Sequence, residues 1–227
     1  MFNEVKMQAR MEWADYRYLG EENYFLLTKE LYDMEIDLGK EVRDSLHWSR
    51  RFEYPWLYIN LEPFTKDDIV LDAGAGNTVL QFILSKRVRQ MHSLDKDMDD
   101  VNWANKVSEE RRFSNVFSIV GDLTNMTFLS DYFDKVICIS TLEHLPKQKV
   151  LDGVEELIRV TKQGGKIAIT MDIVLEKTDK QTDITDFGSI ARKYSFAIPE
   201  FPQHVMIFKV APYNFPFAIA CILLEKF

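Results

Sequence analysis

Residues 70–77 read Val70-Leu71-Asp72-Ala73-Gly74-Ala75-Gly76-Asn77, and they determine the architecture that we expect for the chain. The apolar residues before Asp72 predict a short buried strand, and the apolar spacing from Val79 onward predicts a helix. Gly74 and Gly76 permit a tight turn and a close approach of the backbone to a ligand, because glycine has no Cβ atom. The following helix offers free N–H groups at its N-terminus. Two interpretations are open at this point: a ligand-binding turn, or a tight strand–helix connection without a ligand.

Short apolar runs alternate with helical patterns downstream of this turn. Strands are predicted at 69–71, 91–94, 116–120, 135–139 and 166–170, and helices at 79–89, 97–110 and 147–162. This alternation is typical of βαβ units, whose parallel strands are covered by helices on both faces. After Asp172 two further runs, 205–210 and 217–225, are joined by a short connection, which favours antiparallel pairing. We therefore expect an α/β fold: a Rossmann-like, doubly wound sheet of seven strands with a C-terminal antiparallel hairpin.

The first sixty residues differ from the rest in composition and in pattern. They are rich in aromatic residues, and their pattern favours helices until Pro55 and Pro63 interrupt it. We predict an N-terminal helical extension over residues 1–62 and a ligand-binding domain over residues 63–227. The aromatic residues Trp13, Tyr16 and Tyr24 either form a lid over the site or dock the extension onto the rest of the chain.

Composition excludes several classes of protein and of site. The chain has 227 residues and a net charge of −8, which disfavours general nucleic-acid binding because phosphate contacts require clustered positive charge. Cys138 and Cys221 lie in apolar runs, so we expect reduced core thiols, no disulfide and no metal site. No apolar run approaches the ~20 residues that span a bilayer, and the N-terminus is polar. We expect a cytoplasmic protein without a membrane partner.

Acidic residues close three successive predicted strands: Asp72, Asp95 and Asp122. Because parallel strands end at the same edge of a sheet, their side chains are expected to face one crevice. An acid in the place of Asp95 suits two vicinal ribose hydroxyls, and Asp122 suits an exocyclic amine such as that of adenine. Taken singly, Asp95 has a second explanation as a helix cap, and a lone Gly-Asp pair such as Gly121-Asp122 is usually a turn. The series of three favours a nucleoside site.

These motifs resemble those of the class I S-adenosylmethionine-dependent methyltransferases. The glycine motif of that family, DxGxGxG, is similar to residues 72–78, with Thr78 in place of the third glycine. Residues 133–145 resemble the FDxVxxxxxLEHL segment of small-molecule methyltransferases, and Gly164-Gly165-Lys166 fits the segment before strand five. The resemblance covers about residues 68–227. It is specific for the fold and the cofactor, not for the substrate.

The resemblance implies S-adenosylmethionine as cofactor and a role for each matching residue. The glycine loop would approach the methionine part, and Asp72 would orient that loop or hold the amino group through water. The remaining residues would contact the ribose and the adenine or line the pocket. The implied cofactor-binding residues are Asp72, Ala73, Gly74, Gly76, Asn77, Asp95, Lys96, Asp122, Leu123 and Ser140.

Residues outside the cofactor motifs are candidates for catalysis and for acceptor binding. His144 is either a general base, since its ordinary pKa suits proton removal near neutral pH, or a residue that packs beside the pocket. Arg50 or Arg51 either pairs with the cofactor carboxylate or is surface charge. Asp172, at the end of the fifth strand, is positioned to touch the acceptor.

The function that the resemblance implies is methyl transfer from S-adenosylmethionine to a small-molecule acceptor, at oxygen or nitrogen. Two alternatives are open: a non-catalytic cofactor-binding protein that acts through partners, and an aminopropyl transferase on the same fold. A dinucleotide-dependent dehydrogenase is disfavoured, because its third glycine would fall at Val79.

Overall fold

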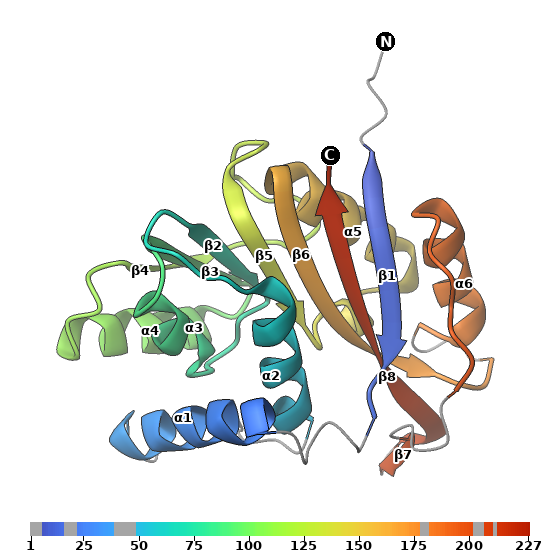
Figure 1. The fold of residues 1–227 in the computed structure, drawn as a ribbon, viewed down its shortest axis with the longest axis horizontal. Coiled ribbons are helices and arrows are strands. Elements are labelled where there is room, and N and C mark those ends of the chain that lie inside the picture. Colours follow the sequence, from blue (N-terminus) through green and yellow to red (C-terminus); the bar gives the residue numbers. More distant parts are fainter. Residues whose placement is uncertain (1–5, 16–21, 39–48, 178–181, 202–206, 211–212) are drawn as a thin grey trace.

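The computed structural model describes residues 6–15, 22–38, 49–177, 182–201, 207–210 and 213–227. One mixed sheet runs through the molecule, with helices on both of its faces (Figure 1). Its strands are β1 (Met7–Trp13), β2 (Ile69–Ala73), β3 (Gln90–Asp95), β4 (Val116–Val120), β5 (Phe133–Ile139), β6 (Thr161–Val174), β7 (Ile207–Val210) and β8 (Tyr213–Lys226). The helices are α1 (Glu22–Leu38), α2 (Arg50–Leu61), α3 (Leu80–Ser85), α4 (Met98–Glu110), α5 (Lys147–Val160) and α6 (Ile184–Lys193), with a short 3-10 helix η2 (Leu142–His144).

The strand order is β1-β8-β6-β5-β2-β3-β4, and β7 pairs with β8 off this path. Strands β4, β3, β2, β5 and β6 are mutually parallel, whereas β8 is antiparallel to both β6 and β1. The chain progresses in one direction from β2 through β3 to β4, and in the other from β5 to β6. The order of the sheet thus reverses at β2, which is where ligands bind in doubly wound sheets.

Alternate side chains of each central strand enter two separate hydrophobic cores. In β5, Val136 and Cys138 pack with α5 and α6 on one face, while Ile137 and Ile139 pack with α2 and α3 on the other. This is the period of two that a strand buried on both faces requires. The predicted doubly wound α/β fold with its C-terminal antiparallel pair, here β7 and β8, is confirmed. Cys138 and Cys221 are buried free thiols, as expected.

The prediction of helical structure was wrong for residues 7–13. They form β1, which pairs with β8 from Met7↔Lys226 to Trp13↔Ala220. Strands β1 and β7 therefore share one edge of β8, since β7 pairs with the earlier residues of β8. Trp13 is 3% exposed, and its Nε1 donates a hydrogen bond of 2.9 Å to the carbonyl of Pro199. Trp13 thus packs as part of the sheet rather than as a lid.

Helices α1 and α2 agree with the predicted helical pattern of the extension, although Pro55 lies inside α2 instead of interrupting it. Tyr16 and the side chain of Tyr24 lie outside the described part of the structure. The division into an extension over residues 1–62 and a domain over residues 63–227 stays a prediction. Among the described residues, no helix combines the length and the apolar character that crossing a membrane requires.

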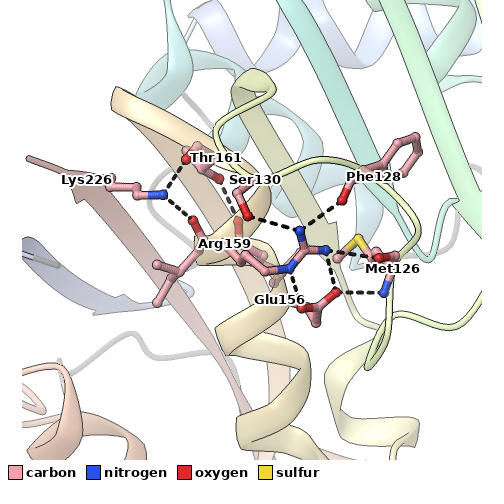
Figure 2. A network of polar contacts seen from close by, with 9 residues as sticks. Met126, Phe128, Ser130, Glu156, Arg159, Thr161 and Lys226 are labelled. Carbon is pink, nitrogen blue, oxygen red and sulfur yellow. Dashed lines mark hydrogen bonds and ion pairs between the residues drawn. The ribbon is translucent and has the colours of Figure 1, made fainter. Parts of the chain in front are cut away.

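A polar network lies near the amino ends of the central strands β5 and β6 (Figure 2). Arg159 in α5 pairs with Glu156 and donates hydrogen bonds to the carbonyls of Met126 and Phe128. Lys226, at the end of β8, donates to the carbonyls at the end of α5 and the start of β6 (2.9 and 2.7 Å). Together these contacts tie α5 to the loop before β5 and to the end of β8.

Candidate active site

A cavity of about 1090 Å³ lies at the carboxyl ends of β5, β2, β3 and β4. Its walls come from the segments that follow these four strands, together with Arg50 and Tyr54 of α2. The cavity therefore lies at the reversal point of the strand order. Its volume is slightly above the usual range for small-molecule sites, ~300–1,000 Å³.

The glycine loop after β2 has the conformation that its sequence predicts. Gly74 and Gly76 have φ values of +80° and +54°, which side chains disfavour. A Cβ atom at Gly74 would lie 2.2 Å from Cγ2 of Thr141, so no other residue fits there without displacing Thr141. The Thr141 hydroxyl donates a hydrogen bond of 3.2 Å to the Gly74 carbonyl. The loop is thus fixed against the segment that follows β5.

Asp95 joins the glycine loop to the start of α4. Its Oδ2 accepts a hydrogen bond from the Gly76 N–H (2.8 Å), and its Oδ1 accepts one from the Asp97 N–H (2.9 Å). Asp95 is partly exposed and lines the cavity. Each carboxylate oxygen has a further lone pair, so the side chain can also accept hydrogen bonds from a ligand.

Asp122 lies at the exposed end of the cavity, after β4. One of its oxygens accepts hydrogen bonds from the backbone N–H and the hydroxyl of Thr124 (2.8 and 2.9 Å). These bonds lower the pKa of Asp122, so its carboxylate is ionised at neutral pH. The apolar side chains of Leu94, Val120 and Leu123 line the cavity beside it. This end of the cavity therefore offers an apolar slot with an anionic rim.

Asp72 is 3% exposed and lines the middle of the cavity. Burial and the negative charge of Asp95 raise the pKa of Asp72 to about 7, although Arg50 opposes this shift. Asp72 is thus partly protonated near neutral pH. A cationic group bound beside it would favour the ionised form.

Arg50 lies at the β5 end of the cavity and is held there by Glu53 and Ser140. Its Nη1 lies 2.5 Å from Glu53 Oε2 and 2.7 Å from the Ser140 hydroxyl. Ser140 has a φ of +45°, a value in which residues other than glycine are strained. Arg51, by contrast, is exposed and is not among the residues that line the cavity.

His144 ends η2 and its exposed side chain lines the cavity. Desolvation, together with the positive charges of Lys96 and Arg50, lowers the pKa of His144. The imidazole is therefore largely neutral at pH 7 and able to accept a proton.

The structure brings together almost all of the residues that the sequence indicated. Every predicted cofactor residue except Ala73 lines the cavity, and so does His144. Ala73 is fully buried in β2, where it belongs to a hydrophobic core. Asp172 is also not among the lining residues; burial and the charge of Glu53 raise its pKa to about 7.

Sequence reasoning missed several residues of the cavity wall. Tyr54 lies on α2 and Lys149 on α5, and neither was predicted to line the site. Thr141 directly follows Ser140, so its place at the end of β5 was the available signal. Among the described residues, no group of three or more His, Cys, Asp and Glu side chains is arranged to hold a metal ion.

Comparisons with known proteins identify a methyltransferase domain in the chain. Residues 70–165 match the family model of a methyltransferase domain, while no curated protein matches the chain. Geranyl diphosphate C-methyltransferase from Streptomyces coelicolor A3(2) is similar in structure, with a TM-score of 0.62 and 12% identity over 92% of this chain and 99% of the other. The PH0226 protein from Pyrococcus horikoshii OT3 has a TM-score of 0.60 and 18% identity over 87% and 99% of the two chains. The [4+2]-cyclase SpnF has a TM-score of 0.58 and 15% identity over 75% and 79%.

At these identities the structural likeness establishes the fold, and the family model identifies the domain. The matched residues 70–165 contain the glycine loop after β2 and the acids that follow β3 and β4. They also contain β5, which delivers Ser140 and His144 to the cavity. Residues 70–165 thus match a methyltransferase domain, within a chain that has the fold of solved S-adenosylmethionine-dependent methyltransferases.

Proposed function

We propose that the cavity binds S-adenosylmethionine in an extended conformation and transfers its methyl group to a small-molecule acceptor, at oxygen or nitrogen. The observation that carries this proposal is the order of groups along the strand ends. Arg50 and Ser140 lie at β5, the glycine loop follows β2, Asp95 follows β3 and Asp122 follows β4. Adjacent strands are ~4.8 Å apart, so these groups span roughly 14 Å. That length suits an elongated ligand with an amino acid at one end and a nucleoside at the other.

The chemistry of each group supports this orientation of the cofactor. Asp95 can accept two hydrogen bonds from vicinal ribose hydroxyls through lone pairs that the backbone leaves free. The apolar slot of Leu94, Val120 and Leu123 suits a flat adenine ring, with Asp122 at its exocyclic amine. Arg50 offers a guanidinium to the carboxylate at the opposite end, and Asp72 offers a carboxylate to the amino group. The residues present therefore fit the cofactor of the family.

When bound, S-adenosylmethionine supplies a methyl group on a positively charged sulfur. The chain's own contribution is mainly to position that group and the acceptor in line, which supplies much of the rate in displacement reactions. His144 can accept the proton that an acceptor hydroxyl or amine loses, because its imidazole is neutral near pH 7. Acceptors that ionise readily would need this step less.

The experiment that tests methyl transfer is an acceptor screen with the purified protein and S-adenosylmethionine labelled in its methyl group. Pools of small alcohols, phenols and amines are scored for labelled product and for S-adenosylhomocysteine. We expect equal amounts of both with at least one pool, and neither product with Asp95→Ala.

A parallel assay uses decarboxylated S-adenosylmethionine. Release of methylthioadenosine there, without methyl transfer in the first assay, would establish aminopropyl transfer instead. Tight binding without turnover in either assay would favour a non-catalytic binder.

A further inference from the structure

Glu53 is a fully buried carboxylate that no sequence motif identified. It lies in α2 and is 0% exposed. Its Oε1 accepts hydrogen bonds from the Ser140 hydroxyl (2.6 Å) and the Thr170 hydroxyl (2.5 Å), and its Oε2 lies 2.5 Å from Arg50 Nη1. One side chain thus joins α2 to Ser140, directly after β5, and to Thr170 within β6.

The carboxylate of Glu53 is ionised despite its burial. Burial by itself would raise its pKa, but the charge of Arg50 and the hydrogen bonds from Ser140 and Thr170 hold the pKa below its ordinary value. A buried charge with this many partners fixes their geometry, because each partner must stay in place to compensate the lost hydration. Glu53 therefore determines where Arg50 and Ser140 point.

Two of the three partners of Glu53 line the cavity, whereas Glu53 does not. Arg50 and Ser140 belong to the cavity wall at the β5 end, and Thr170 is fully buried behind them. Ser140 needs such support, since its positive φ is unfavourable for a residue with a side chain. The guanidinium of Arg50 has five N–H donors, so its bonds to Glu53 and Ser140 leave others for a ligand.

We propose that Glu53 is a positioning residue for the cofactor: it holds Arg50 and Ser140 in place to bind the α-amino-carboxylate end, and it has no role at the nucleoside end. This inference rests on the proposed function, because it assumes that the amino acid end lies beside Arg50. It assigns to α2, a helix outside residues 70–165 that the family model matches, a part in recognising the cofactor.

The test compares two ligands that differ only at the amino acid end of the cofactor. S-adenosylhomocysteine and 5′-methylthioadenosine share the nucleoside and the thioether sulfur, but the second lacks the amino and carboxyl groups. Affinities are measured by calorimetry for the wild type, Glu53→Gln and Arg50→Gln. We expect both variants to bind S-adenosylhomocysteine about tenfold or more weakly, as for lost hydrogen bonds to charged groups. Their affinities for 5′-methylthioadenosine should stay within about twofold of the wild-type value.

Arg51→Gln is the matched control, because it removes the same charge from the same helix at an exposed position outside the cavity wall. It should change neither affinity. Thr170→Val is the second variant and keeps Glu53 in the chain if Glu53→Gln does not fold. It removes one hydrogen bond to Oε1 and should weaken S-adenosylhomocysteine selectively, by a smaller factor.

The outcomes distinguish a wrong role for Glu53 from a wrong proposed function. Equal weakening of both ligands in Glu53→Gln or Thr170→Val would mean that Glu53 only stabilises the fold, and it would overturn the inference. So would unchanged binding of both ligands in folded Glu53→Gln. If the wild type binds neither ligand, the proposed function itself is wrong.

Discussion

Asp72 combines burial with a charge that the cofactor would need. The pKa of Asp72 is raised to about 7 in the folded chain, whereas the unfolded chain has an ordinary carboxyl pKa. Ionisation of Asp72 therefore lowers the free energy of unfolding. This loss of free energy of unfolding grows as the pH rises from about 4 to about 7 and is constant above that range. Asp72→Asn should therefore raise the melting temperature, with a gain that increases over this pH range. A change of about 1 kcal/mol in the free energy of unfolding shifts the melting temperature of a chain of this size by ~2–4 °C.

Melting curves of both proteins between pH 4 and pH 8, without ligand, measure this difference. The same variant should bind S-adenosylhomocysteine more weakly than the wild type, because it lacks the carboxylate for the amino group. A constant difference in melting temperature at all pH values would contradict the raised pKa.

His144 is a candidate base whose pKa lies below its ordinary value. Once an acceptor is known, the rate should rise with pH through the lowered pKa of His144 and then reach a plateau, because only neutral imidazole accepts a proton. His144→Gln should lower kcat by ~10²–10⁴-fold and leave the affinity for S-adenosylhomocysteine unchanged. His92→Gln is the control, since His92 packs on Phe117 and is not among the residues that line the cavity. If kcat of His144→Gln is within a few-fold of the wild-type value, His144 is not a base and catalysis depends on positioning alone.

The elements of the N-terminal region show where sequence reasoning succeeded and where it did not. β2 to β6 were predictable because β-branched runs, glycine turns and closing acids agree along residues 68–174. β1 was missed although Met7, Ala9, Met11 and Trp13 alternate with polar residues, which is the signal of a strand half buried on one face. Its pairing with β8 joins the two ends of the chain, and no local pattern encodes that contact.

The candidate site also has residues that the sequence predicts and residues that it does not. The glycine loop and the acids after β3 and β4 belong to one contiguous stretch, so spacing alone located them. The contact of Glu53 with Ser140 and Thr170 joins residues 87 and 117 positions apart. Such a contact depends on how α2 packs across the sheet, which the sequence of α2 does not specify.

β1 gives the N-terminal region a structural role that can be tested. Deleting residues 1–15 would remove β1, expose the hydrogen-bonding edge of β8 and leave the contacts of Trp13 with Phe187 and Phe201 unmade. We expect a loss of several degrees in melting temperature and a tendency to aggregate, measured by calorimetry and light scattering. A matched control replaces Gln8, at an exposed position of β1, by threonine and keeps the strand. A truncated chain as stable as the wild type would contradict the assignment of β1 to the sheet.

At the scale of the whole molecule, the position of the cavity explains why distant segments contribute to it. The strand order reverses at β2, so the loops after β2 and β5 diverge there and leave space between them. α2 lies beside that space and supplies Arg50 and Tyr54, while α5 supplies Lys149 from the other side. A ligand that fills the cavity would contact segments from residue 50 to residue 149 and should stabilise them together.

The most direct test of this account is a calorimetric titration of the chain with S-adenosylhomocysteine. The account predicts one site per chain. It also predicts a loss of affinity in Asp95→Ala, because two hydrogen bonds to a charged acceptor are worth ~1.5–3 kcal/mol each. Asp97→Ala removes a neighbouring carboxylate that caps α4 and does not line the cavity, so it should bind as the wild type does. Absence of binding by the wild type, or unchanged affinity in Asp95→Ala, would contradict the assignment of the cavity to the cofactor.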